Sequence, residues 1–241
     1  MKNDVLLSLS GGVPVHVAVR RSERARRIRL RVTESGPELV VPVYADMDAA
    51  LEFLRSQSLW LETALKQNRR EPLTHPSELR LAFTGEHLKL VYEAQDVVWT
   101  GVRYRSPTEL LVSGNTAEAS SCIEALRQWL MRKAKLEILP FAADICSELN
   151  FEISGFTLGL QRRVWGTCNS KRRIALNAAL LFFPREIVRY VVIHEGCHLT
   201  EMNHSVRFWN LVKKYYPYPE HARRILNGRD SALPAWVHAK L

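Results

Sequence analysis

The segment VVIHEGCH, residues 191–198, constrains this chain more than any other part of its sequence. An apolar run leads into two histidines that are four residues apart, and a glutamate directly follows the first of them. On a helix, residues four apart lie one turn apart on the same face, so both imidazole rings can reach one metal ion. The segment therefore predicts a largely buried helix that presents a metal-binding face.

The donor set of this segment favours a catalytic zinc ion. Neutral imidazoles suit zinc, which lowers the pKa of a bound water from about 16 to about 7. Glu195 is adjacent to His194 and is placed to take a proton from that water. A catalytic zinc needs three protein ligands and an open position, so one ligand is required besides His194 and His198. We expect one zinc ion per chain.

His204 is the strongest candidate for the third ligand. It follows His198 at the spacing of the metzincin pattern H-E-x-x-H-x-x-G-x-x-H. Glu201 stands where that pattern has glycine, so the turn must be made otherwise, for example through Asn203, which tolerates a positive φ. Glu201 lies one turn beyond His198 and is the rival third ligand. More distant candidates follow downstream, at Glu220 and His221.

The first half of the chain is rich in β patterns. Alternating residues predict strands at 13–20, 27–33 and 38–43, and a second β stretch at 79–112. Asp46 or Asp48 is expected to cap one helix between these two stretches. A helical region at 116–149 follows, in which Pro140 marks a kink or a break.

The last third predicts three strands followed by three helices. The strands are expected at 151–160, 164–168 and 173–177, and the helices at 185–202, 206–216 and 220–226. Ser205 is expected to cap the second of these helices. The fold class is therefore α+β. We place a boundary between a β-rich N-terminal region with one helix, residues 1–114, and the motif-bearing region, residues 115–241.

Arginines are concentrated near the N-terminus, at positions 20, 21, 24, 26, 27, 29 and 31. A strand would place Arg27, Arg29 and Arg31 on one face and aliphatic residues on the other. A solvated strand face is the simpler interpretation, and a groove for the phosphates of a nucleotide or nucleic acid is the alternative. The net charge of +9 is compatible with such an anionic partner but does not require one.

The four cysteines share no CxxC spacing, which favours free thiols in a reducing compartment. Gly11, Gly12 and Pro14 interrupt the apolar N-terminal run, which makes it a poor signal peptide. No stretch approaches the roughly 18 apolar residues that a membrane span requires. We expect a cytoplasmic protein that has no membrane partner.

Several short blocks surround the motif: RVWGTCN at 163–169, IALN at 174–177, HEGCHL at 194–199, NHS at 203–205 and FW at 208–209. In this order and spacing they resemble the YgjP-like metallopeptidase family, which is related to the SprT-like and WLM zincins. The resemblance implies a zincin-like catalytic region, with the active-site helix against a small mixed sheet. It also implies zinc ligands at His194, His198 and His204, and a catalytic base at Glu195.

Two residues depart from the family pattern. Thr167 stands where serine is usual, and it keeps a hydroxyl group. Gly196 stands where a larger residue is common, at a cost to the helix of up to about 1 kcal/mol relative to alanine. Neither departure removes a catalytic group.

Five further residues are candidates for substrate contacts. In a zincin, a strand beside the active-site helix can hold an extended substrate by main-chain pairing. Trp165, Gly166 and Thr167 form the candidate strand, and a core tryptophan beside a closely packed glycine is an equally good interpretation. Asn203 and Arg207 are candidates to stabilise a developing oxyanion, although helix capping and surface solvation are simpler roles for them.

Three functions fit these features. The first is a zinc-dependent hydrolase, best described as a metallopeptidase that acts on a peptide or protein, in which Glu195 activates the water and protonates the leaving amine. The alternative is a metal-dependent nucleotide phosphohydrolase, similar to a nucleoside triphosphate pyrophosphatase, whose substrate phosphates bind the arginine-rich strand. The third is a nucleic-acid-binding module with a structural zinc, for which the sequence offers no obvious fourth ligand.

Overall fold

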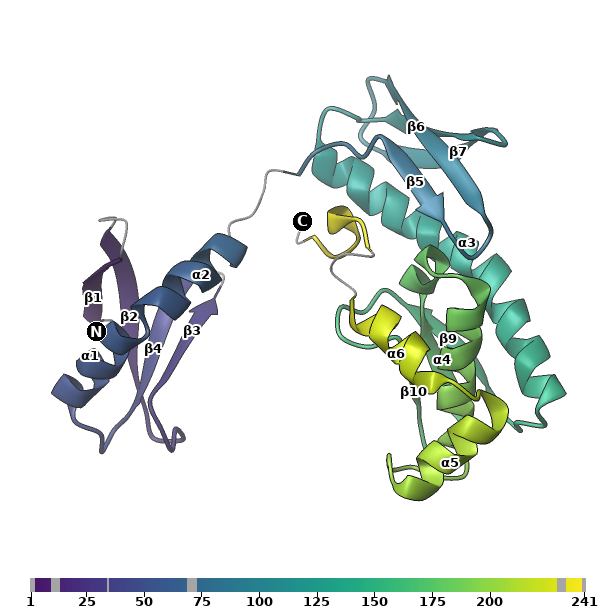
Figure 1. Cartoon of the computed structure of the whole chain (residues 1–241). Coiled ribbons are helices and arrows are strands. Elements are labelled where there is room, and N and C mark those ends of the chain that lie inside the picture. Colours follow the sequence, from purple (N-terminus) through teal and green to yellow (C-terminus); the bar gives the residue numbers. More distant parts are fainter. Residues whose placement is uncertain (1–2, 10–13, 34, 69–72, 229–232, 240–241) are drawn as a thin grey trace. The chain divides into compact units, whose positions relative to one another are not determined.

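The chain divides into two compact units, Met1–Pro72 (unit 1) and Leu73–Leu241 (unit 2) (Figure 1). The computed structural model describes residues 3–9, 14–33, 35–68, 73–228 and 233–239. Each unit has its own hydrophobic core and mixes strands with helices, which confirms the α+β class. No helix of the described residues is long and apolar enough to cross a membrane.

Unit 1 is a four-stranded mixed sheet with two helices across one face (Figure 1). In sheet order its strands are β1 (Asn3–Ser8), β2 (Pro14–Ser22), β4 (Gly36–Pro42) and β3 (Arg29–Thr33). Only β2 and β4 are parallel neighbours. The helices are α1 (Met47–Ser56) and α2 (Ser58–Asn68). Aliphatic side chains such as Val17, Leu39 and Leu54 fill the space between the two layers.

Two helices stand where the sequence predicts one. Asp46 caps α1 as expected, because its Oδ2 accepts a hydrogen bond of 3.0 Å from the main-chain N–H of Ala49. Gln57 then separates α1 from α2. Strand β1 was not expected, and residue 13, the first of the predicted strand 13–20, lies outside the described residues.

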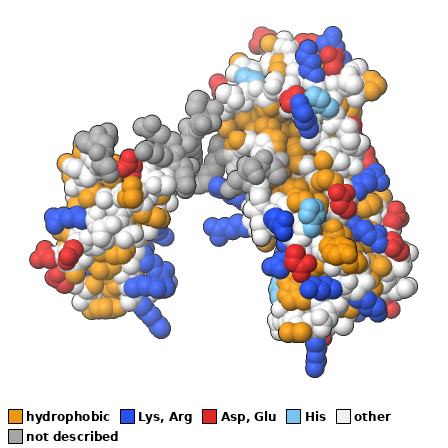
Figure 2. All heavy atoms as spheres, viewed as in Figure 1, with side chains coloured by type: hydrophobic (Ala, Val, Ile, Leu, Met, Phe, Trp, Pro, Cys, Tyr) orange, Lys and Arg blue, Asp and Glu red, His pale blue; other side chains and the backbone are white. Residues whose placement is uncertain are grey.

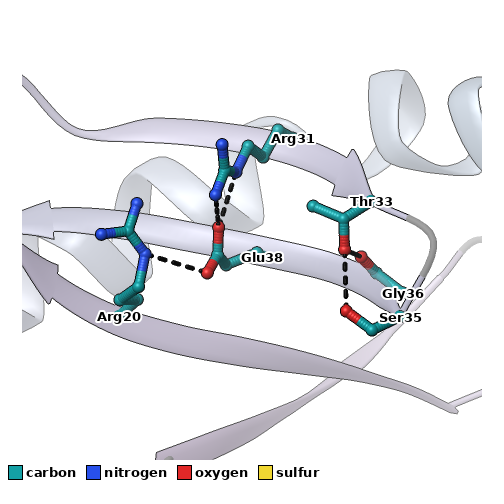
Figure 3. A network of polar contacts seen from close by, with 6 residues as sticks. All are labelled: Arg20, Arg31, Thr33, Ser35, Gly36 and Glu38. Atoms are coloured by element: carbon teal, nitrogen blue, oxygen red, sulfur yellow. Dashed lines mark hydrogen bonds and ion pairs between the residues drawn. The ribbon is translucent and has the colours of Figure 1, made fainter.

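The arginine-rich strand forms with the predicted alternation. Arg29 and Arg31 are exposed on β3, whereas Arg27 lies in a bend before the strand begins. Blue Lys and Arg side chains project from unit 1 in Figure 2. Glu38 on β4 pairs with both Arg31 and Arg20, with Nε to carboxylate distances of 2.6 and 3.0 Å (Figure 3). Two of the arginines therefore already have a carboxylate partner.

Unit 2 contains two small sheets that both pack against a long helix, α3 (Ala119–Glu148). The first sheet has the order β5 (Glu78–Leu81), β6 (Glu86–Ala94), β8 (Glu109–Gly114) and β7 (Thr100–Ser106). The second has the order β10 (Gly166–Cys168), β11 (Arg173–Asn177) and β9 (Gly155–Gly159). β11 is antiparallel to β10 and parallel to β9, so the second sheet is mixed, as expected.

The remaining elements of unit 2 are short helices. They are η1 (Ala178–Phe182), α4 (Arg185–Cys197), α5 (Val206–Tyr215), α6 (Pro219–Asn227) and η2 (Ala235–His238). The motif-bearing helix α4 begins after Pro184 as predicted, but it ends earlier than residue 202. Ser205 caps α5, since its hydroxyl accepts a hydrogen bond from the N–H of Phe208 at 3.3 Å.

The division between the units lies after Pro72, whereas the sequence suggests one near residue 114. The turn at residue 114 joins β8 directly to α3, and both pack into one core. Leu110 of β8 and Leu126 of α3 belong to the same buried cluster as Ile193 of α4. The second β stretch is therefore part of the motif-bearing unit.

Pro140 does not divide α3 into two helices. Ile138 and Ala142, two residues before and two residues after Pro140, are fully buried in the core of unit 2. This packing holds the helix together and offsets the main-chain hydrogen bond that proline removes.

A charged network ties α3 to the first sheet. Lys133 of α3 lies 2.9 Å from Glu86 of β6 and 3.0 Å from Glu137. The hydroxyl of Tyr104 donates to the other oxygen of Glu86 at 2.7 Å. Partial burial on its own would raise the pKa of Glu86, but hydrogen bonds from Thr84, Tyr104 and Lys133, together with the charge of Lys133, hold it below its usual value.

We expect Glu86→Gln to lower the free energy of unfolding of unit 2 by about 1–2 kcal/mol at pH 7. Because the folded pKa of Glu86 is depressed, the difference is present in full above pH 4.5 and is lost as the pH falls through the lowered pKa. Urea unfolding at pH 7 and pH 3 measures both values. The exposed Glu93→Gln on the same strand is the control, and an unchanged difference at pH 3 would contradict the assignment.

Candidate metal centre

Three histidines converge at the end of α4. His194 and His198 come from successive turns of that helix, and His204 comes from the segment that precedes α5. One ligand atom from each lies within 4.8 Å of the other two. The Nε2 atoms of His194 and His204 are 3.0 Å apart. The structure thus brings together the three residues that the sequence proposes as ligands.

The surroundings of these rings suit zinc binding. The Nδ1 atom of His198 is 3.0 Å from the main-chain carbonyl of Glu201, so it carries the proton and leaves the Nε2 lone pair free for a metal. The hydroxyl of Tyr190 is 3.5 Å from Nδ1 of His194. Burial, reinforced by the other two histidines, lowers the pKa of His194 to about 3 and keeps it in the neutral form that ligation needs.

Aromatic residues of α5 pack against the imidazole rings of His198 and His204. Phe208 is fully buried and stacks on His198, with ring centroids 4.5 Å apart. Trp209 stacks on His204 at 5.7 Å. Because the Ser205 cap fixes the start of α5, it also fixes these two aromatic rings.

The turn between α4 and His204 differs from the expected one. Asn203 does not have a positive φ, since outside glycine the described residues with positive φ are Asn150 and Arg172. The chain leaves α4 through tight turns instead, in which the N–H of Leu199 donates to Gly196 at 3.1 Å. Glu201 contributes its main-chain carbonyl to His198 rather than a carboxylate to the three-histidine group.

Glu195 is buried against strand β10. Only 6% of its surface is exposed, and this burial raises the pKa of its carboxyl group to about 8. A Cβ atom at Gly166 would lie 2.7 Å from Cγ and 2.9 Å from Oε1 of Glu195. No side chain larger than hydrogen therefore fits at position 166 unless Glu195 moves.

The glycine inside the motif also has a packing reason. A Cβ atom at Gly196 would collide with the ring of Phe151. That ring in turn packs edge-on against Tyr215 of α5, with centroids 5.3 Å apart. The close approach of Phe151 explains why this chain has glycine where a larger residue is common.

Residues 26–229 match the family model of the YgjP-like metallopeptidase domain. The chain belongs to the YgjP-like family. It is therefore a zinc-dependent hydrolase. A comparison with curated proteins found no match.

Two solved structures are similar over part of the YgjP-like chain, and both are archaeal metallopeptidase zymogens. Abylysin of Pyrococcus abyssi is 22% identical, with a TM-score of 0.34, over 37% of this chain and 92% of that one. Jannalysin of Methanocaldococcus jannaschii is 21% identical, with a TM-score of 0.34, over 40% of this chain and 97% of that one.

The candidate substrate residues of this YgjP-like chain occupy different environments. Trp165 is half-buried, packs edge-on against Phe183 at 4.8 Å and donates from Nε1 to the carbonyl of Leu226 at 3.1 Å. These contacts fit the interpretation of Trp165 as a tryptophan that packs against the core. Thr167 is exposed on β10, at the edge of the second sheet. Asn203 and Arg207 are exposed on either side of His204 in the sequence.

A cleft of about 220 Å³ lies between β10, α4 and α6. Gly166, His194 and Glu195 line one part of it, and Arg223 and Asn227 of α6 line another. Arg223 belongs to no motif that the sequence reveals. Its only local signal is the four-residue spacing to Asn227, which places both on one face of a helix but does not say what that face meets.

We expect about one zinc ion per chain in the purified protein and much less in His204→Ala after identical mild dialysis. Loss of one of three imidazoles leaves too few ligands for tight binding. Glu201→Ala is the matched variant and is expected to retain zinc, because only the main chain of Glu201 contacts a ligand. Retention of zinc by His204→Ala together with loss by Glu201→Ala would show that Glu201, and not His204, is the third ligand.

Gly166→Ala is expected to reduce turnover by about 10- to 100-fold while zinc content is retained, since the methyl group displaces Glu195 and not the histidines. Gly159→Ala, in the same sheet, is the control. Its Cβ atom would make only ordinary contacts, at 3.5 Å or more, with the flexible side chain of Gln161. Equal turnover of the two variants would argue against the contact.

Proposed function

We propose that this protein is a metallopeptidase that holds one zinc ion with His194, His198 and His204 and uses Glu195 as its base. The observation that carries the proposal is the position of Glu195. Its carboxyl group is buried directly after the first histidine and against the edge strand β10. A base in this position lies between the metal ligands and a strand edge that suits an extended peptide.

When bound, zinc supplies a Lewis acid that activates a water molecule and polarises the scissile carbonyl. Glu195 takes a proton from the attacking water and passes it to the leaving amine. Burial raises the pKa of Glu195 to about 8, and a zinc ion bound nearby would favour the ionised form that accepts the proton.

Strand β10 is the proposed support for the substrate. It pairs with β11 on one side and is the last strand of the sheet on the other. An extended peptide can add to such an edge by main-chain hydrogen bonds. Gly166 presents no side chain toward Glu195, which keeps the base close to this edge. Asn203 and Arg207 remain the candidates to stabilise the oxyanion.

The other two functions have less support. A structural zinc site needs a fourth protein ligand, and among the described residues no further His, Cys, Asp or Glu joins the three-histidine group. A nucleotide phosphohydrolase would use the arginines of unit 1 as its phosphate site. Arg31 is already paired with Glu38, which leaves Arg27 and Arg29 as the predicted anion contacts.

The test is a side-by-side assay of wild type and Glu195→Gln on unfolded casein and on nucleoside triphosphates, with zinc content measured in both. We expect casein cleavage by the wild type and a loss of at least about 100-fold in the variant. Phosphate release that depends on Glu195, without any peptide cleavage, would replace the proposal with the phosphohydrolase.

A further inference from the structure

Helix α6 forms one wall of the cleft beside the candidate catalytic groups. Arg223 and Asn227 are four residues apart on this helix, so both side chains belong to the face that lines the cleft. Leu226 lies between them in sequence and is buried at the same wall. His194 and Glu195 line the same cleft. A cation and an amide from α6 thus share one cleft with the candidate catalytic groups.

In the described part of the chain Arg223 forms no ion pair within 4.0 Å, although its charge adds to the effect of a main-chain hydrogen bond and of Lys213 in lowering the pKa of Glu220. Its guanidinium group lies over the ring of Trp209, with Cζ 4.5 Å from the ring centroid. Glu220, one turn earlier on α6, is paired with Lys213 at 3.2 Å. Glu195 is the only acidic residue that lines the cleft, and it is the proposed base.

The stacking on Trp209 makes Arg223 suitable for binding a ligand. A guanidinium group that already rests over an indole ring loses less conformational freedom when it also hydrogen-bonds to a ligand. The same Trp209 stacks on His204, so one indole ring contacts both the guanidinium group of Arg223 and a proposed metal ligand. A single guanidinium fork matches a carboxylate in both charge and geometry.

We propose that this cleft is a subsite for a substrate carboxylate, bound by Arg223 next to the scissile bond. The inference rests on the proposed peptidase function and adds the class of substrate. The cleft volume of about 220 Å³ is enough for one substrate side chain, whose apolar part would contact Val164, Trp165 and Leu226. The carboxylate belongs either to an Asp or Glu side chain or to the C-terminus of the peptide.

The test uses the full-length, zinc-loaded protein and a proteome-derived peptide library, with cleavage sites identified by mass spectrometry. Arg223→Glu and Arg223→Gln are compared with wild type, and Arg224→Glu is the matched control. Arg224 is the next residue of α6 and is exposed, but it does not line the cleft. Peptides with Glu, Gln or Lys at the selected position, each with a free or an amidated C-terminus, separate the two sources of the carboxylate.

We expect wild type and Arg224→Glu to prefer a carboxylate by about tenfold or more in kcat/KM, the size of one charge-assisted hydrogen bond. Arg223→Gln is expected to lose this preference, and Arg223→Glu to reverse it toward Lys. Zinc content reports whether the variants are folded. An unchanged preference in both Arg223 variants, or no preference in wild type, would overturn the inference while the peptidase proposal stands.

A binding measurement keeps the two proposals separable. Fluorescein-labelled pentapeptides with Glu or Gln at the centre are titrated into Glu195→Gln and into Glu195→Gln combined with Arg223→Gln. We expect the Glu peptide to bind more tightly only when Arg223 is present. Equal binding of both peptides would reject the subsite. Selective binding without cleavage by wild type would retain the subsite and reject the peptidase.

Discussion

The contact between Glu195 and Gly166 sets the geometry of the site, because it determines how closely β10 approaches α4. The segment before β10 is held in place by Asn177, whose side-chain amide donates to the carbonyls of Gln161 and Val164 at 2.7 and 2.8 Å. Asn177 is itself buried at the end of β11. The strand edge, the base and the first metal ligand are thus positioned by one small set of main-chain contacts.

Burial has a common effect on the polar groups of this site. It lowers the pKa of His194 to about 3 and raises the pKa of Glu195 to about 8, so both groups are pushed toward their neutral forms. Neutral imidazoles are what a zinc ion requires, and a divalent cation near Glu195 favours its ionised form. The apolar core that stabilises α4 therefore also keeps His194 in the neutral form that a metal ion requires.

The sequence predicted the features that depend only on residues close to one another along the chain. The i, i+4 histidines, the caps at Asp46 and Ser205, and the alternation along β3 follow from backbone periodicity. The unit boundary after Pro72, the continuity of α3 through Pro140 and the position of Arg223 depend on which elements share a core. No pattern within a short window reports such long-range packing. The sequence therefore places the boundary elsewhere, leaves a kink or a break open at Pro140 and does not mark Arg223.

The arginines of the two units show why composition alone does not identify an anion site. Arg20 and Arg31 are exposed and conspicuous in the sequence, yet both pair with Glu38, so that two guanidinium groups and one carboxylate leave a single positive charge. Arg223 and its neighbour Arg224 are less conspicuous in the sequence, but Arg223 contacts an aromatic ring instead of a carboxylate. An arginine that forms no ion pair within its own fold is available to bind an anionic ligand. Only the packing of α6 beside the metal site shows that Arg223 is such a residue.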